Sequence, residues 1–590
     1  MILPPGVKPM SEQNPIQPVY LEILSKFGEN LRLDDRPNYF GIIAQTEKIL
    51  EVLTFIKDSL FYDFLSSVTA VDDFPEEKIE IIYHLYQSVG GVGIEIKVFV
   101  SREDSQVPSI THLYPGAELQ EREIYDLFGV KFIDHPDLRR ILLWEGFAGH
   151  PLRKDWTEPQ YEEPAKPFKS RWPEGKGVLT ESLNPYNDNV QYPRKFDPAK
   201  FEPDNEQTLY RKLQQKSNDT PNTLHTDQLI VNLGPQHPST HGVFRMVAAL
   251  EGETIVDLKP VIGYLHRNHE KIGERNTYLQ IMPYTDRLDY LSSMNNSFGY
   301  AITIERMMGI QPAIRAEYIR IMMAELTRIA SHIWSIGFLL NDLGAYFTPA
   351  LYAMEERELI LDIFEALAGS RMMCNYLRFG GVVRDINEEI LKKVSDLVYN
   401  RLERKTDELD RYLTDNEIIR SRCEGVGILT SEQAIAYSVT GPLLRSSGVP
   451  YDIRRADPYG IYDQLEFDIC TRQHGDVYDR YLIRLDEIRQ SLRILKQVLT
   501  QIPEGPVMNG KVQYNVRVPA GEMYGRVEGP RGELGFYVVS DGKPNPKRFH
   551  VRAPSFVNIT SLAEMCRGAK IADAVTILGS VDIVLGEVDR

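Results

Sequence analysis

A long proline-rich tract constrains most strongly how this chain can fold. Between Pro151 and Pro221 prolines recur among Glu, Lys, Asn and Asp, with almost no helical or alternating apolar pattern. Because proline breaks helices and central strands, such a tract is typical of a linker. At 590 residues the chain is also too long for one ordinary core. We therefore predict two domains, residues 1–155 and 225–590, joined by a linker over residues 156–224.

The composition is that of a globular protein with an acidic surface. Hydrophobic residues make up 42% of the chain and charged residues 26%. The net charge of −17 argues against a nucleic-acid binder, because no basic stripe is present to neutralise phosphates. The most apolar stretch, residues 329–354, is interrupted by His332, Asn341 and Asp342, so no membrane span is predicted. The N-terminus lacks the basic-then-apolar pattern of a signal peptide, so a cytoplasmic setting is expected.

The cysteines exclude several classes of site. They are scattered along the chain and form neither a CxxC pair nor a disulfide framework: Cys374, Cys423, Cys470 and Cys566. No four-cysteine spacing suited to an iron-sulfur cluster occurs, and no metal site is predicted.

Apolar periodicity predicts an α+β fold. In the first domain, alternation at residues 79–85 and 94–100 around Gly90-Gly91 predicts an antiparallel hairpin, with helices near 47–57 and 117–128 completing a small α/β domain. The second domain is predicted to be large and mainly α-helical with small flanking β-sheets. Its expected helices are 316–340, 354–368, 387–413 and 477–499, and its expected strands are 228–233, 244–250, 535–540 and 550–553.

The segment Gly234–Gly242 places two histidines in a loop of helix breakers. Its prolines and glycines set a fixed backbone path, so His237 and His241 are expected at defined positions. There His241 can donate a hydrogen bond or a proton. Alternatively, both histidines are structural groups in a tight turn.

Two further polar residues suit a ligand with two carbonyl oxygens. Tyr290 ends the segment Met282–Tyr290, and Asp342 interrupts the apolar end of a predicted helix, where a carboxylate is costly to bury without a partner. An imidazole and a phenol each offer one proton, while a carboxylate fixes the imidazole tautomer. A quinone has this requirement.

Arg267 is a candidate for a site beside a redox centre. A guanidinium there stabilises the negative charge of the reduced centre. The alternative is a surface ion pair with Glu270 or Glu274.

Other motifs carry less chemical information. Dense charge at residues 121–129, 135–142 and 149–155 suits either a solvated loop or a docking surface. The segment Glu528–Glu533 is predicted to be a turn, and it lacks the lysine of a phosphate-binding loop. Residues 586–590 are interpreted as a polar terminus.

These motifs resemble the fused C and D subunits of bacterial NADH:quinone oxidoreductase, respiratory complex I. Residues 121–155 match the signature of the C subunit; residues 231–300, together with 528–533 and 586–590, match the D subunit. The resemblance implies an oxidoreductase component of the peripheral arm, on the cytoplasmic side of the bacterial inner membrane. It implies the B and I subunits and the membrane-embedded H subunit as partners, with no direct membrane or nucleic-acid binding.

The resemblance also implies roles for the candidate residues. His241 and Tyr290 would contact the quinone headgroup, Asp342 would partner the histidine, and Arg267 would lie near the terminal iron-sulfur cluster, which the B subunit holds. NAD would bind to another component of the complex. Met373 stands where many members of the family carry a histidine beside the cluster, so a cluster potential that depends on that imidazole is not expected here.

The D subunit is in turn similar to the large subunit of nickel-iron hydrogenases. Residues 528–533 and Asp589 would be remnants of that ancestry, but both CxxC pairs that hold the metals are missing. The metal cavity is therefore expected to have become the quinone site. The alternatives are a docking scaffold without direct quinone contact and a hydrogenase-like metal enzyme.

Overall fold

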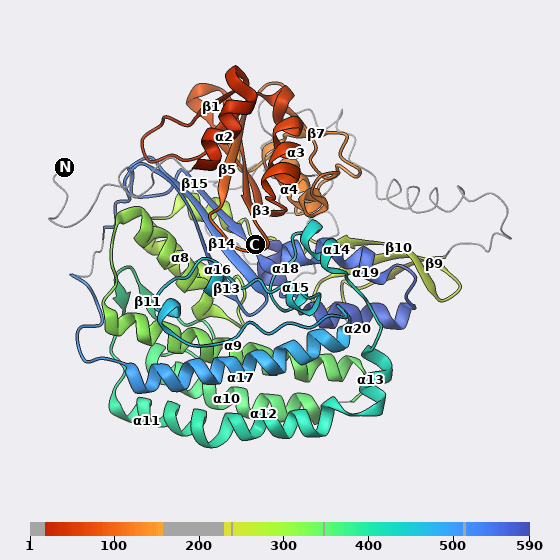
Figure 1. Ribbon diagram of the computed structural model, residues 1–590, viewed down its shortest axis with the longest axis vertical. Coiled ribbons are helices and arrows are strands. Elements are labelled where there is room, and N and C mark those ends of the chain that lie inside the picture. The colour runs from red at the N-terminus through yellow and green to blue at the C-terminus, as the bar shows by residue number, and fades with distance from the viewer. Residues whose placement is uncertain are drawn as a thin grey trace, which may run out of the picture.

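The computed structural model describes residues 18–144, 147, 149–156, 229–237, 240–345, 348–510 and 515–590. Nearly all of the predicted linker lies outside these residues. Helices and strands are mixed, in agreement with the predicted α+β class. Figure 1 shows the strands of the N-terminal part (residues 18–156) above those of the C-terminal part (residues 229–590), with long helices below. None of the described helices combines the length and apolar character needed to cross a membrane.

A five-stranded mixed sheet forms the centre of the N-terminal part. Its order is β1-β2-β5-β4-β3, and only β2 and β5 pair in parallel. The predicted hairpin is confirmed as β4 and β5, with Ile81 opposite Val98. The strands are β1 (Leu31–Leu33), β2 (Ile42–Ala44), β3 (Phe64–Asp73), β4 (Lys78–Tyr86) and β5 (Ile94–Ser101), followed by the parallel pair β6 (Gln106–Pro108) and β7 (Lys131–Ile133). The helices are α2 (Pro18–Phe27), α3 (Ile49–Leu60) and α4 (Glu118–Phe128), and the last two confirm the predicted ones.

Four long helical segments dominate the C-terminal part, as predicted. They are α9 (Ile314–Asp342), α10 (Thr348–Ala368), α17 (Val477–Gln501) and a helical run over residues 388–414. The run comprises α11 (Glu388–Asp396) and α12 (Glu403–Leu409), each followed by a π-helical stretch, Leu397–Leu402 and Asp410–Thr414. Asn387 starts it by accepting a hydrogen bond from the Ile390 N–H at 2.9 Å. Helix α9 packs against both α17 and α10 and is buried along most of its length.

Shorter helices connect this bundle to the sheets. They are α6 (His269–Arg275), α7 (Tyr278–Thr285), α8 (Ser293–Met308), α13 (Glu417–Cys423), α14 (Ser431–Ala436), α15 (Pro442–Ser446), α16 (Ile453–Ala456), α18 (Pro554–Asn558), α19 (Leu562–Cys566), α20 (Ile571–Val581) and α21 (Leu585–Asp589).

Two three-stranded antiparallel sheets flank the helices. One contains β8 (Leu229–Leu233), β9 (Arg245–Glu251) and β10 (Thr254–Val261); the other contains β13 (Gly521–Gly529), β14 (Gly532–Ser540) and β15 (Arg548–Arg552). A two-residue pair joins β11 (Leu377–Arg378) to β12 (Gly381–Val382). The predicted turn at Pro530-Arg531 is confirmed, since it links β13 to β14.

Strands β3, β10 and β13 were not predicted. Nine of the ten residues of β3 are buried, as are eight of the nine in β13. A strand covered on both faces shows no alternation of apolar and polar residues, which explains these two omissions.

A cluster of buried charges joins the two parts. Lys97, on β5, is fully buried, and its ammonium lies 2.8 Å from the Asp34 carboxylate and in contact with that of Glu522, on β13. Glu522 also accepts from the Tyr537 hydroxyl at 2.6 Å and from the Phe40 N–H at 2.9 Å. The surrounding carboxylates raise the pKa of Lys97 despite its burial, so the ammonium stays charged.

We predict that Lys97→Met destabilises the chain strongly. It leaves two buried carboxylates without their shared counter-charge, a loss of roughly 3–5 kcal/mol in the free energy of unfolding. Denaturant unfolding of the full-length chain measures this loss in the free energy of unfolding. Lys393→Met is the control, because Lys393 forms an exposed helical pair with Glu389 and its loss should cost about 0.5 kcal/mol or less. Equal effects of the two substitutions would contradict the prediction.

Candidate functional site

The histidine loop between β8 and β9 holds His241 in an unusual backbone conformation. Its φ of 52° is left-handed, a region that costs free energy for residues other than glycine. The Thr240 hydroxyl supports the loop by donating to the carbonyl oxygen of His237 at 2.7 Å. His237 itself is exposed and pairs through its backbone with Gly242.

His241 and Asp342 are brought together although 101 positions separate them along the chain. The imidazole Nε2 lies 2.6 Å from a carboxylate oxygen of Asp342, the last residue of α9. The side chains are 17% and 9% exposed. Burial opposes the charged imidazole, but the hydrogen bond and charge of Asp342, aided by Asp582, outweigh it and raise the pKa of His241.

The pair leaves the second ring nitrogen of His241 available. Within the described residues Nδ1 makes no hydrogen bond, because the single contact of the imidazole is to Asp342 through Nε2. The helix that faces the pair, α20, has Gly579 at this point. A Cβ there would lie 2.6 Å from the Asp342 carboxylate, so a larger residue would displace it.

Tyr290 lies in the turn before α8 and is partly buried. Within the described residues its hydroxyl makes no hydrogen bond. Burial raises the pKa of this phenol, and the charge of Asp289 adds to the effect, while Arg531 and Arg267 partly offset it. Gly586 packs against the ring, since a Cβ there would lie 3.2 Å from the Tyr290 Cδ1.

A buried arginine connects the tyrosine to the histidine. Arg531, in the turn between β13 and β14, donates to the Asp289 carboxylate at 2.6 Å and to the Asp582 carboxylate at 3.1 Å. Its charge also acts on the pKa of both His241 and Tyr290. Sequence reasoning treated Arg531 only as part of a turn. The signal in the sequence was that Arg531 lies between two glycines and two glutamates. So short a pattern does not reveal contacts with residues far away in the sequence.

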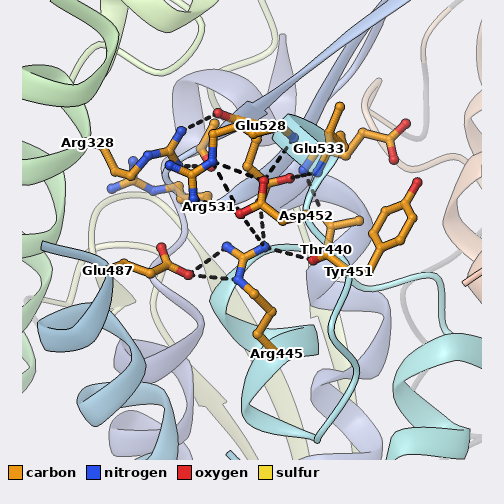
Figure 2. A network of polar contacts seen from close by, with 12 residues as sticks. Arg328, Thr440, Arg445, Tyr451, Asp452, Glu487, Glu528, Arg531 and Glu533 are labelled. Carbon is orange, nitrogen blue, oxygen red and sulfur yellow. Dashed lines mark hydrogen bonds and ion pairs between the residues drawn. The ribbon is translucent and has the colours of Figure 1, made fainter. Parts of the chain in front are cut away.

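Around Arg531 the charges continue into a larger buried network, drawn in Figure 2. Arg445 pairs with Glu528 at 2.8 Å and with Glu487 at 2.7 Å. The Glu487 carboxylate is also hydrogen-bonded to Nε2 of His332, on α9, at 2.7 Å. These contacts tie β13, α17 and α9 together beneath the candidate site.

The local interpretation of Arg267 and of residues 586–590 was wrong. Instead of forming a surface ion pair, the exposed Arg267 guanidinium donates to the carbonyl oxygens of Arg287 and Gly586, at 2.9 and 3.2 Å. Residues 586–590 are buried rather than a polar terminus. The Asp589 carboxylate accepts the Leu265 N–H at 2.6 Å, and such long-range contacts leave no local pattern.

The charged motif at residues 121–129 is neither a solvated loop nor an exposed surface. It forms most of α4, and Glu121 and Asp126 are fully buried. Asp126 accepts the N–H groups of residues 141, 142 and 143 at 3.0, 2.9 and 2.9 Å, which ties the next motif to the helix. Burial raises the pKa of Glu121 to about 8.

One group of side chains has metal-ligand geometry. Glu123, Glu270 and His550 offer ligand atoms within 4.8 Å of one another. The Arg548 guanidinium already lies 2.7 Å from Glu270, and Arg590 lies 3.1 Å from Glu123. These cations neutralise the carboxylates, so the group does not suit a metal ion.

Comparison with known proteins identifies the family. Residues 342–517 and 510–590 match the family described as respiratory-chain NADH dehydrogenase, 49 Kd subunit, and residues 42–162 match the 30 Kd subunit. The chain is 36% identical over 589 residues to the NADH-quinone oxidoreductase C/D subunit of Nitrosospira multiformis, covering 94% of this chain and 91% of that one. The chain belongs to the C/D subunit family of NADH-quinone oxidoreductase.

Separate D subunits match the second part alone. The D 1 subunit of Roseiflexus sp. (strain RS-1) is 57% identical over 374 residues, 62% of this chain and all of the relative. The D subunit of Dehalococcoides mccartyi (strain ATCC BAA-2266 / KCTC 15142 / 195) is 53% identical over 367 residues, with the same coverage. The resemblance inferred from the motifs is therefore confirmed, and the protein is a component of an oxidoreductase, complex I.

We predict that Asp342→Asn lowers the pKa of His241. The raised pKa means that the pair stabilises the folded chain below the usual histidine pKa of about 6.5, and that this contribution is lost as pH rises through the raised value. The difference in melting temperature between the unaltered chain and the variant should therefore be largest below about pH 6.5 and should shrink as the pH rises above it. In a His241→Gln background the effect of Asp342→Asn should lose this pH dependence; its persistence would contradict the pairing.

Proposed function

We propose that the chain forms the protein side of a quinone-reduction site, with His241 and Tyr290 as donors to the quinone headgroup. The observation that carries the proposal is the pair of uncommitted donors, His241 Nδ1 and the Tyr290 hydroxyl, on a scaffold joined by Arg531. Neither atom is among the buried polar atoms without a partner, so each remains accessible to a polar ligand.

The chemistry of these donors suits quinone reduction. A quinone takes up two electrons and two protons, one proton at each oxygen. Asp342 holds the imidazole by Nε2, which orients Nδ1 and favours the protonated ring. After His241 has given up its proton, the charge of Asp342 favours renewed protonation of the imidazole. Tyr290 can donate a second hydrogen bond, and its raised pKa keeps the phenol protonated.

We propose that the electrons come from an iron-sulfur cluster held by a partner, the B subunit. The residues of this chain do not fit a cluster, since burial raises the pKa of all four thiols to about 12 and disfavours the thiolate that a cluster needs. Arg267 would face that cluster with its exposed guanidinium. NAD would bind to a further component of the complex.

The surface near Arg267 supports this docking. Tyr264 and Leu265 are 46% and 38% exposed, large apolar side chains that a partner would cover. The I and H subunits are the other expected partners, and contact with the cytoplasmic side of the inner membrane would be peripheral, through the complex. The alternative, a docking scaffold without direct quinone contact, would use the same surface. It would not require His241 Nδ1 and the Tyr290 hydroxyl to be without partners.

We also propose that the chain consists of the domains 1–155 and 225–590 with a linker over 156–224, and that the second domain has a hydrogenase large-subunit-like fold. The separate matches of the 30 Kd family to residues 42–162 and of the 49 Kd family to residues 342–517 and 510–590 support the division. The turn at Arg531 and the buried Asp589, both near the candidate site, support the second statement.

We predict that Tyr290→Phe and His241→Ala lower quinone reductase activity of the assembled enzyme by about a hundredfold or more, the usual effect of losing a proton donor. NADH oxidation by an artificial acceptor should be unchanged, because the quinone site is bypassed. Tyr284→Phe is the matched control: Tyr284 lies in the same segment, is 39% exposed, and should be dispensable. Normal quinone reduction in both test variants would refute the proposal.

A further inference from the structure

A cleft of about 460 Å³ lies where the N-terminal and C-terminal parts meet, and none of His241, Tyr290 or Asp342 lines it. Its lining comes from four segments of the chain: Asp72, Phe74, Pro75, Lys154, Lys271, Glu274, Arg275, Asp541, Lys543, Asn545, Pro546 and Lys547. Lys154 belongs to the charged motif at residues 149–155, which the proposed quinone chemistry does not use.

The cleft is positively charged. Five cationic side chains line it against three carboxylates, and those carboxylates are already committed. Asp72 accepts from Arg102 at 2.7 Å, Glu274 from Lys154 at 2.6 Å, and Asp541 lies 2.6 Å from Lys543. Lys547 pairs with Asp73 at 2.8 Å. Lys154, Lys543 and Lys547 are therefore paired with carboxylates, and the cationic surplus of the lining does not include them.

Lys271 contributes most to that surplus. It is 8% exposed, and its ammonium makes a single hydrogen bond within the described residues, a long one of 3.3 Å to the carbonyl oxygen of Arg153. An ammonium has three protons to donate, and no carboxylate of the described residues forms an ion pair with it. Burial lowers the pKa of Lys271; the charges of Glu274 and Asp72 oppose this shift, and the like charges of Lys154 and Arg275 add to it. A buried cation in this state is costly unless an anion joins it.

We propose that this cleft binds the phosphate group of a small anion, with Lys271 at its base. A phosphate supplies several acceptors and up to two negative charges, and the Lys271 ammonium can donate to it as a point charge. The volume lies in the range of small-ligand pockets. Phe74, which is 42% exposed, and two prolines give the cleft an apolar wall, so the phosphate belongs either to a free inorganic anion or to a nucleotide whose base contacts Phe74.

Titration of the purified full-length chain with pyrophosphate and with ADP, at constant ionic strength, tests the proposal. Saturable binding by calorimetry and a rise in melting temperature are expected, and Lys271→Gln should weaken the affinity at least about tenfold. Lys271→Arg should retain binding. Tighter binding of ADP that is lost in Phe74→Ala assigns a nucleotide, whereas equal binding of the two ligands assigns the free anion.

The ligand-free Lys271→Gln variant separates a ligand site from a structural ion pair. Because it removes an unpaired buried cation, its melting temperature should equal or exceed that of the unaltered chain; a lower one would indicate a structural role and overturn the proposal. Lys393→Gln, an exposed lysine on α11, is the control and should bind normally. Absence of saturable binding, or equal binding by Lys271→Gln, would also overturn it.

Discussion

The buried guanidinium of Arg531 is the interaction on which the candidate site depends. It is held by the carboxylates of Asp289 and Asp582, so three segments far apart in sequence meet at one charge. Asp289 precedes Tyr290, and Asp582 ends the helix that packs on the His241 and Asp342 pair. Removing one partner of such a buried pair costs roughly 3–5 kcal/mol, so the two donors are positioned by a contact that is expensive to break.

Paired buried charges also hold the helices of the bundle in place. Helix α9 supplies Asp342 at its end and His332 further back, where His332 meets Glu487 and, through it, Arg445. Charges buried at this density are tolerated only when each has a partner, which restricts the packing of α9 to one register. The position of the Asp342 carboxylate is therefore determined by contacts deep in the protein rather than by the loop around it.

Much of the fold could be predicted from the sequence, because long helices and half-exposed strands leave a period in the chain. The helices α9 and α17 and the hairpin of β4 and β5 were found in this way. Strand β3 was not, because burial on both faces removes its alternation. The contact of His241 with Asp342 had been expected only from the family resemblance, since no local pattern links residues 101 positions apart. Arg531 was missed for the same reason, and the domain boundaries and residue roles stay predictions.

Energetically unfavourable features of the candidate site are offset by contacts elsewhere in the chain. His241 Nδ1 and the Tyr290 hydroxyl have no hydrogen-bond partner within the described residues, so neither contributes such a bond to the stability of the folded chain. The left-handed backbone at His241 adds a further cost. The buried ion pairs around Arg531 and Arg445 offset both costs. Gly579 and Gly586, which have no side chains, leave space beside the Asp342 carboxylate and the Tyr290 ring. Stabilising ion pairs are thus concentrated around Arg531 and Arg445, so the proposed donors need no partner within the chain.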